Sequence, residues 1–194
     1  MQHLRSPGQR AGLTHARVLA AARELLAEHG PEALTMRSLA LRLDVSPNAL
    51  YSHVESKTAL IDDVLDDVLS EVQAPAAGVQ NPNTGLHALM ASTHDVLLAH
   101  ADLVPLYLAR RGARGPNAQR LGEIVLALLA RQGVAGPRAR EALRVLIVYT
   151  IGFTTFATQT PLMPDDQQEP SARELAENFN SGLRWLLNGI TVPN

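Results

Sequence analysis

Apolar residues recur every three or four positions through most of the chain, which is the spacing of an amphipathic helix. The first such stretch follows Thr14, a good N-cap, and its apolar stripe ends at Leu26. Gly30 and Pro31 come soon after and are expected to stop the helix. The pattern therefore predicts that the chain opens with one helix between Thr14 and Gly30.

Two short helices and a longer one are predicted next. Thr35 and Ser46 are good N-caps for the short pair, and Asp44 lies where the chain must turn between them. The second of the pair is expected to run only to about residue 53. A longer helix opens at Ser56 and continues to about residue 73, with an apolar face opposite a strongly acidic one. The acidic face is formed by Asp62, Asp63, Asp66 and Asp67.

Five further helices are predicted after residues 74–84, which read as a loop by composition. Together the helices predict an all-α fold, with an N-terminal three-helix helix-turn-helix domain and a larger C-terminal helical bundle domain. The later helices are expected at about 85–100, 103–110, 116–132, 137–159 and 171–188. The predicted boundaries are a flexible arm at 1–13, the helix-turn-helix at 14–56, a connecting helix at 57–73 and the second domain at 74–194.

Composition narrows the class of protein. Hydrophobic residues make up 46% of the chain, which is enough for a core, and aromatic residues only 4%, which favours helices over sheets. The chain has no cysteine, so disulfides and thiolate metal sites are excluded. Its net charge of −2 excludes a generally basic surface but not a local basic face.

The sequence predicts a cytoplasmic protein without a membrane partner. Residues 1–12 have no apolar core, so they are not expected to be a signal peptide. The longest apolar stretch, 145–157, is too short to span a bilayer and contains several hydroxyl side chains. That stretch is therefore expected to be a buried helix.

The predicted third helix carries side chains suited to a DNA groove. Pro47, Asn48 and their neighbours are small or polar where a core helix would carry Leu or Ile, and Asn suits adenine. Leu50 and Val54 can hold the same helix onto the other two. The alternative is plain packing of two short helices.

Cations at two helix starts also suggest an external partner. Arg37 and Lys57 lie in first turns, where positive charge opposes the helix dipole. Thr35 adds a hydroxyl at a helix N-terminus, which suits phosphate. A solvated Arg37 and a chance placement of Lys57 remain the alternatives.

The residues of this region resemble the DNA-binding signature of the TetR family of bacterial regulators. The matching pattern is L-T-x-R-x-L-A from Leu34, then V-S-x-x-x-L-Y-x-H from Val45, then K-x-x-L from Lys57. The match is closest to the branch that contains the tetracycline repressor. Asp44 is a departure, since the family usually has Gly in that turn.

The resemblance implies a role for each matching position. Arg37, Pro47 and Asn48 fall where this branch touches bases, and Thr35, Tyr51, His53 and Lys57 fall where the family grips phosphates. The operator sequence does not transfer, because the base-reading positions vary most within the family.

The resemblance also implies that the second domain senses a ligand and forms a homodimer through about 137–159 and 171–190. The sequence agrees, because residues 145–156 are apolar nearly all round and the last helix carries a long apolar stripe. An ordinary intrachain core would give the same pattern.

A small-molecule pocket is expected among the helices between residues 85 and 159. Each candidate lining residue could instead belong to the core, and Arg110 and Arg111 could either meet an anionic effector or form a solvated pair. The branch holds a drug–magnesium complex at positions that here carry Tyr107, Arg110 and Val125, so that ligand is not expected. The pocket candidates are Met90, His94, Tyr107, Val125, Tyr149, Phe153 and Phe156.

No metal or other cofactor is expected, because His87 and His94 are seven residues apart and metal-binding pairs on a helix are usually four apart. The sequence therefore predicts a ligand-responsive transcriptional regulator that binds a palindromic operator as a homodimer and is released by a small-molecule effector. The alternatives are a helical protein–protein adaptor and a small helical enzyme. An enzyme is not expected, since no catalytic set of residues stands out.

Overall fold

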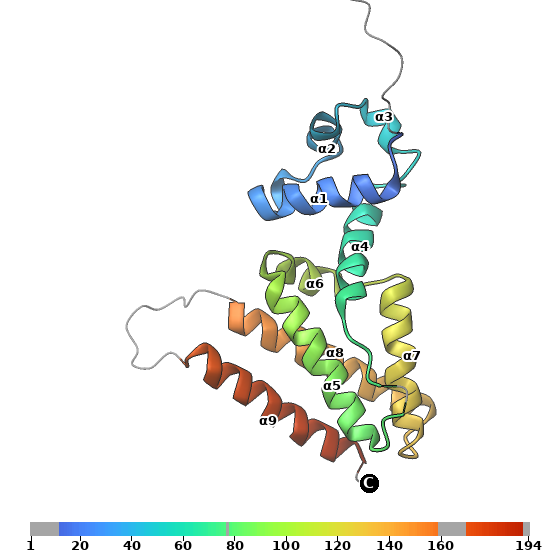
Figure 1. Ribbon diagram of the computed structural model, residues 1–194, viewed down its shortest axis with the longest axis vertical. Helices are drawn as coiled ribbons and strands as arrows, with labels where there is room; N and C mark the ends of the chain where they lie inside the picture. The colour runs from blue at the N-terminus through green and yellow to red at the C-terminus, as the bar shows by residue number, and fades with distance from the viewer. Residues whose placement is uncertain (1–11, 77, 159–169, 192–194) are drawn as a thin grey trace, which may run out of the picture. The chain divides into compact units, whose positions relative to one another are not determined.

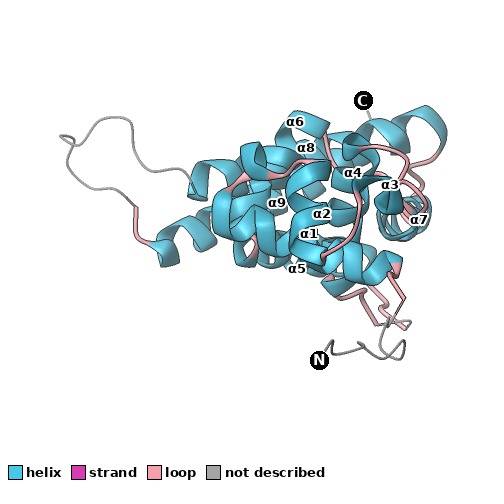
Figure 2. Ribbon diagram, turned by 90° about the horizontal axis from the view of Figure 1, so that it is seen from above, coloured by secondary structure: helices cyan, strands magenta, loops and turns pink. Residues whose placement is uncertain are grey.

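The protein is all-α in every part that the structure describes. The structure, a computed structural model, describes residues 12–76, 78–158 and 170–191, and no strand occurs in those ranges (Figures 1 and 2). The predicted fold class is confirmed. The predicted arm at 1–13 lies almost wholly outside the described residues. The chain divides into two compact units, 1–64 and 65–194, and the boundary falls within one helix, α4, Lys57–Val68.

The N-terminal unit begins with α1, His15–His29, which has the caps predicted for it. The Thr14 hydroxyl accepts a hydrogen bond from the Arg17 N–H at 3.3 Å. Gly30 ends the helix with φ at 75°, a conformation that costs glycine little. A short 3₁₀ turn, Pro31–Ala33, leads on to the next helix.

The two short helices are α2, Met36–Leu43, and α3, Pro47–Leu50. Asp44 adopts the left-handed conformation between them (φ 53°, ψ 47°), so the chain makes the turn without a glycine. The expectation that α3 reaches residue 53 is wrong: the helix ends at Leu50 and a turn follows. The Ser52 hydroxyl donates to the Ala49 carbonyl at 2.7 Å, and the His53 N–H bonds the Leu50 carbonyl in a tighter turn.

The C-terminal unit is a bundle in which α5, α8 and α9 pack against one another, with α6 and α7 packed on α8 (Figure 1). It opens with the end of α4 and a 3₁₀ turn, Leu69–Glu71, which is slightly shorter than the predicted helix to residue 73. The other helices are α5 Pro82–Ala99, α6 Val104–Arg110, α7 Pro116–Ala130, α8 Gly136–Thr158 and α9 Ala172–Thr191. A 3₁₀ turn, Ala101–Leu103, precedes α6.

Helix α5 begins earlier than its composition suggested. The segment 74–84 was expected to be a loop, yet residues from Pro82 onward are helical. The Asn81 side chain accepts hydrogen bonds from the Asn83 and Thr84 N–H groups at 2.9 and 3.4 Å. Pro82 then takes the first helical position, where its missing N–H costs nothing. The cap explains why the end of the expected loop, from Pro82 onward, is helical.

Asp66 is not part of an exposed acidic face, contrary to the prediction. It is 5% exposed, and its carboxylate accepts hydrogen bonds from the Asn117 and Ala118 N–H groups at 3.0 and 2.8 Å. These groups belong to the first turn of α7, where Gly115 has no side chain to cap the helix. A Cβ at Gly115 would lie 2.5 Å from the Asp66 Cγ, so glycine permits the close approach. Asp66 is therefore the N-terminal cap of α7, supplied from α4.

We expect Asp66→Ala to lower the free energy of unfolding by about 1–3 kcal/mol, because part-buried N–H groups at the start of α7 lose their acceptor. Glu123→Ala, which removes an exposed carboxylate further along α7, is the control and should change stability by less than about 0.5 kcal/mol. Urea denaturation monitored by circular dichroism measures both. Equal losses for the two variants would contradict the capping role.

Candidate functional site

Helix α3 presents polar and small side chains to solvent while apolar ones hold it in place. Pro47 and Asn48 are exposed, and Tyr51 in the following turn is 53% exposed. Leu50 and Val54 are buried in the core of the N-terminal unit. The Ser46 hydroxyl accepts the Ala49 N–H at 3.3 Å and fixes the start of the helix. The helix therefore offers an outward face with side chains able to enter a groove.

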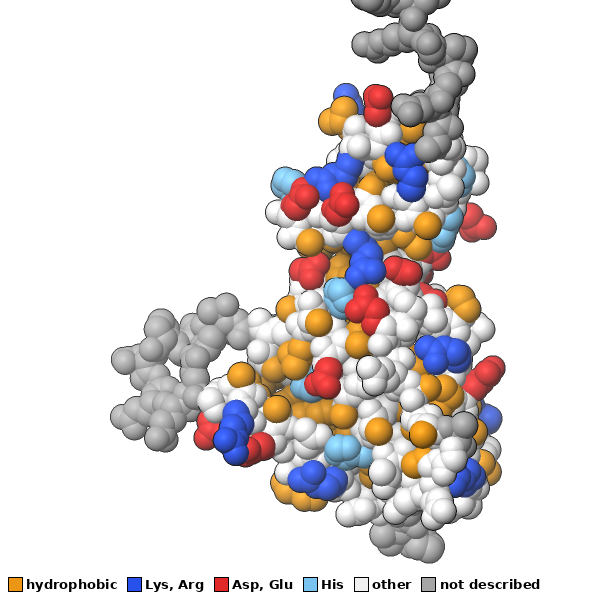
Figure 3. Space-filling view, viewed as in Figure 1, with side chains coloured by type: hydrophobic (Ala, Val, Ile, Leu, Met, Phe, Trp, Pro, Cys, Tyr) orange, Lys and Arg blue, Asp and Glu red, His pale blue; other side chains and the backbone are white. Residues whose placement is uncertain are grey.

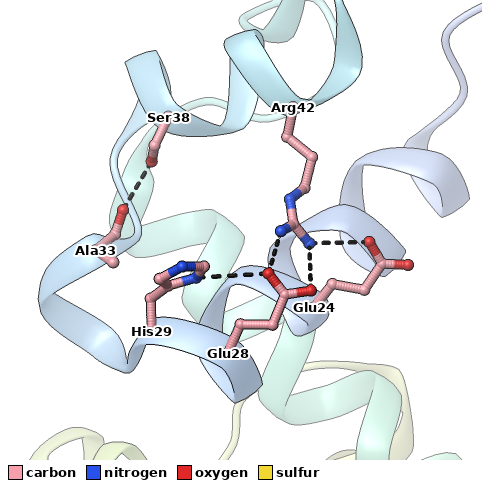
Figure 4. Close-up of polar contacts among 6 residues, drawn as sticks. All are labelled: Glu24, Glu28, His29, Ala33, Ser38 and Arg42. Atoms are coloured by element: carbon pink, nitrogen blue, oxygen red, sulfur yellow. Dashed lines mark hydrogen bonds and ion pairs between the residues drawn. The ribbon is translucent and has the colours of Figure 1, made fainter.

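The two arginines of α2 have different environments. Arg42 bonds Glu24 at 3.0 Å and also pairs with Glu28, which ties α2 to α1 (Figure 4). Hydrogen bonding to Arg42 holds the pKa of the Glu28 carboxyl below its usual value. Arg37 is exposed and makes no hydrogen bond or ion pair with any residue that the structure describes. Arg42 thus has a structural role, while Arg37 is available to an external partner.

Thr35 caps the N-terminus of α2. Its hydroxyl oxygen accepts the Ser38 N–H at 3.0 Å, and the Ser38 hydroxyl oxygen accepts the Thr35 N–H at 2.9 Å. This reciprocal capping fixes the first turn of α2 and leaves its remaining N–H groups at the surface. Thr35 itself is exposed.

The remaining predicted DNA contacts also lie on the surface of the N-terminal unit. His53 in the turn after α3 and Lys57 at the start of α4 are half-buried. The helix is capped by Ser56, whose hydroxyl oxygen accepts the Ala59 N–H at 3.0 Å. On the face shown in Figure 3, Lys and Arg side chains of this unit lie beside Asp and Glu side chains. Positive charge is therefore local, as the overall net charge requires.

A cavity of about 170 Å³ lies inside the C-terminal unit. Of the predicted pocket residues, Met90, Tyr107 and Val125 line it, together with residues of α7 and α8. The Tyr107 hydroxyl donates to the Leu65 carbonyl of α4. Arg111, which the sequence singled out only as one of a pair, also lines the cavity. Its neighbours Gly112 and Ala113 were missed, because a loop after a short helix carries no periodic signal.

His94 is buried outside the wall of this cavity. Its ring stacks on Phe179 with centroids 3.9 Å apart, and its Nδ1 lies 2.7 Å from the Thr154 hydroxyl oxygen. Burial lowers the pKa of His94 below its usual value, so the neutral ring is favoured. The ring therefore joins α5 to α8 and α9.

The other predicted pocket residues lie elsewhere on α8. Tyr149 and Phe153 line a second, open hollow together with Trp185 of α9, and the Tyr149 hydroxyl donates to the Phe179 carbonyl at 2.8 Å. Phe156 is 66% exposed. The structure therefore distributes the predicted pocket residues over a cavity, a buried aromatic cluster and an open surface.

Exposed apolar side chains follow one side of α8 and continue on α9. Val148, Phe156 and Trp185 are 70%, 66% and 76% exposed. By length and composition α8 is apolar enough to cross a membrane, but it packs against α5, α6, α7 and α9 in this unit. The expectation that residues 145–157 are buried is wrong for the single chain, because one side of α8 has no covering element among the described residues.

The described histidines of the C-terminal unit do not form a cluster. His100 bonds Glu71 at 3.0 Å, whereas His94 is stacked in the aromatic cluster. Within the described ranges, no group of three His, Asp or Glu side chains is placed to hold a metal ion.

Comparisons with known proteins match both units. Residues 18–64 match the family described as bacterial regulatory proteins, tetR family, and residues 74–177 match the tetracyclin repressor-like C-terminal domain.

Two relatives show how far the similarity extends. The chain is 28% identical to the class D tetracycline repressor protein of Escherichia coli, over 94% of this chain and 91% of that one. It is 37% identical to an HTH-type transcriptional regulator of Saccharopolyspora erythraea, over 59% of this chain. That match spans about half, 48%, of the relative's length.

Solved structures share the whole fold. Apo ActR from Streptomyces coelicolor superposes with a TM-score of 0.81 at 26% identity, covering 94% of this chain and 97% of that chain. The structure of BioQ with its double-stranded DNA operator superposes with a TM-score of 0.74 at 28% identity, covering 94% of this chain and 100% of that chain. A TetR variant from Acinetobacter baumannii in complex with minocycline superposes with a TM-score of 0.74 at 30% identity, covering 92% of this chain and 96% of that chain.

Proposed function

Because the chain belongs to the TetR family of bacterial regulatory proteins, we propose that it is a repressor that binds a palindromic operator as a homodimer and leaves it when a small molecule binds. The observation that carries the DNA-binding part is α3, whose Pro47 and Asn48 are exposed while Leu50 is buried. Its relative BioQ has been solved with its operator. We assign base contacts to Arg37, Pro47 and Asn48, and phosphate contacts to Thr35, Tyr51, His53 and Lys57.

The homodimer is proposed to form through α8 and α9. Large apolar side chains on both helices face solvent in the single chain, and burying them against a second copy removes them from water. Gly152 of α8 and Gly189 of α9 have no atom near the position of an added Cβ, which leaves room for a partner backbone. A two-fold dimer also matches the symmetry of a palindrome, whose half-sites lie about 34–36 Å apart.

We propose that the cavity is the effector site and that it acts on DNA binding through α4. Two parts of its wall are hydrogen-bonded to α4: Tyr107 bonds the Leu65 carbonyl, and the N–H of Ala118 bonds the Asp66 carboxylate. A ligand that shifts either wall changes the position of α4, whose first residue is Lys57. In the dimer, the two copies of α3 are the recognition helices. An effector that favours a different spacing between them weakens operator binding, and the operator weakens effector binding equally.

The proposed activity is regulation rather than catalysis, since the relatives are transcriptional regulators. A repressor of this kind works where the bacterial chromosome is, so the proposed location is the cytoplasm. A relative structure holds minocycline, but the residues of this cavity differ in chemistry from a metal-chelate site, because its wall carries no His, Asp or Glu.

The phosphate contacts can be tested without knowing the operator. We expect Lys57→Ala to weaken binding to a random-sequence duplex and to lower the slope of log affinity against log salt by about one per protomer, because one counterion-releasing contact is lost. Fluorescence anisotropy between about 50 and 200 mM salt measures the slope. The control, Arg140→Ala, removes an exposed charge from the C-terminal unit and should leave the salt slope unchanged. Equal slopes for wild type and Lys57→Ala would contradict the assignment.

A further inference from the structure

The interior of the cavity suits an apolar body. Most of its wall is aliphatic, from residues such as Leu97, Leu121 and Ile147. Its hydroxyls are already engaged: Thr93 donates to the Leu89 carbonyl at 2.8 Å, and Tyr107 donates to the Leu65 carbonyl. The Thr150 hydroxyl donates to the Met90 sulfur at 3.7 Å. A ligand inside therefore finds few free donors, and apolar contact supplies its affinity.

Arg111 is the only charged residue of this wall among the residues described, and no acidic side chain accompanies it. It is an exposed residue, so it marks the side of the cavity nearest to solvent. Its side chain makes no hydrogen bond or ion pair with any described residue. The wall therefore has a net positive charge at one end and none elsewhere.

The backbone at Arg111 is unusual for an arginine. It ends α6 in the left-handed conformation, with φ at 59° and ψ at 45°, a position that glycine or asparagine takes at lower cost. The Gly112 N–H bonds the Tyr107 carbonyl at 2.8 Å and fixes the turn. Strained residues of this kind concentrate at ligand sites, so the side chain itself has a use at this place.

We propose that the effector is a small carboxylate with a single-ring apolar body, which fills the cavity while its anionic group pairs with Arg111. A guanidinium binds a carboxylate with two parallel hydrogen bonds, which fits a single cation at the solvent side. An apolar cavity of about 150 Å³ holds benzene, and this one, at about 170 Å³, leaves room for one ring with a short substituent. This proposal rests on the cavity being the effector site of the proposed function.

The test compares matched acids and amides by isothermal titration calorimetry on the dimeric protein without DNA. The probes are benzoate, phenylacetate and 3-phenylpropionate, each with its neutral amide. We expect at least one acid to bind about tenfold or more tightly than its amide. Arg111→Gln should abolish that preference, whereas Arg114→Gln, an exposed arginine of the same loop that does not line the cavity, should keep it.

A second variant tests the location. Gly122 lines the cavity on α7, and a Cβ added there would meet only a Leu143 methyl group at 3.8 Å. Gly122→Val should therefore fold, place its methyl groups in the cavity and weaken acid and amide alike. The proposal is overturned if no acid binds, if acid and amide bind equally to wild type, if Arg111→Gln keeps the preference, or if Gly122→Val binds as wild type does.

The same probes distinguish this proposal from the proposed function. An acid that binds through Arg111 but leaves duplex affinity unchanged would support the ligand class and contradict release by an effector at this cavity. Release of the duplex by neutral molecules, with no binding of the acids, would contradict the proposed ligand class and support the proposed function as an effector-released regulator.

Discussion

Trp185→Glu is expected to convert the dimer to a monomer and to weaken operator binding by roughly 100-fold or more, which corresponds to about 2.7 kcal/mol. Trp185 is 76% exposed on α9, beside the apolar side of α8. A carboxylate at the centre of an apolar interface would have to be buried without a partner, which opposes association strongly. A monomer then holds only one recognition helix, so the second half-site makes no contribution.

Sedimentation equilibrium measures the oligomeric state of this variant, and anisotropy measures its DNA affinity. Leu108→Glu is the matched control, because Leu108 is 53% exposed on α6, outside the proposed interface. It should remain dimeric with wild-type affinity. If Trp185→Glu also stays a dimer of unchanged strength, α9 does not form the interface.

Arg37→Ala is expected to reduce operator affinity by about 1–3 kcal/mol per protomer, and thus by roughly 2–6 kcal/mol for a symmetric dimer. The physical reason is that an exposed arginine in the first turn of α2 loses its contact with a base edge. The folded state should be unaffected, since Arg37 is exposed and makes no hydrogen bond or ion pair with the residues described. Affinity is measured by titrating a labelled operator at fixed salt, and preference at the contacted base should relax.

Arg42→Ala gives the contrasting result. Arg42 pairs with Glu24 and Glu28 across α1 and α2, so its loss should lower thermal stability and affect the operator much less (Figure 4). Loss of these pairs also returns the pKa of Glu28 towards its usual value. The lowered pKa stabilises the fold above about pH 4.5, and that contribution fades as the pH falls through the lowered value. A reversal of the two arginines' effects would contradict the assignment.

Features that depend on neighbours in sequence were predictable. The caps formed by Thr14, Thr35 and Ser46 are hydrogen bonds to residues three positions away, so residue type and spacing suffice to find them. Ser171 and Glu174 form a reciprocal capping box, which is also local in sequence. The surface position of the signature residues follows too, because the apolar residues between them have to face the core.

Features that depend on residues far apart in sequence were not predictable. Asp66 shares its helix with other aspartates, and helical periodicity alone assigns it to their face. Its burial follows from Gly115, about fifty positions away, which leaves the start of α7 without a cap of its own. His94 stacks on Phe179 rather than lining the cavity, because α9 covers that side of α5. Phe156 is 66% exposed in the single chain, and the second copy that would cover it in the proposed dimer cannot be seen in one sequence.

Selection of bound sites from a random duplex pool at near-physiological salt shows whether this protein reads a two-fold operator as a dimer. We expect recovery of a palindrome with half-sites about one helical turn apart, and loss of that enrichment for Asn48→Ala at the contacted position. Binding by folded, dimeric, ligand-free protein that selects no sequence, or no binding at all, would contradict this expectation.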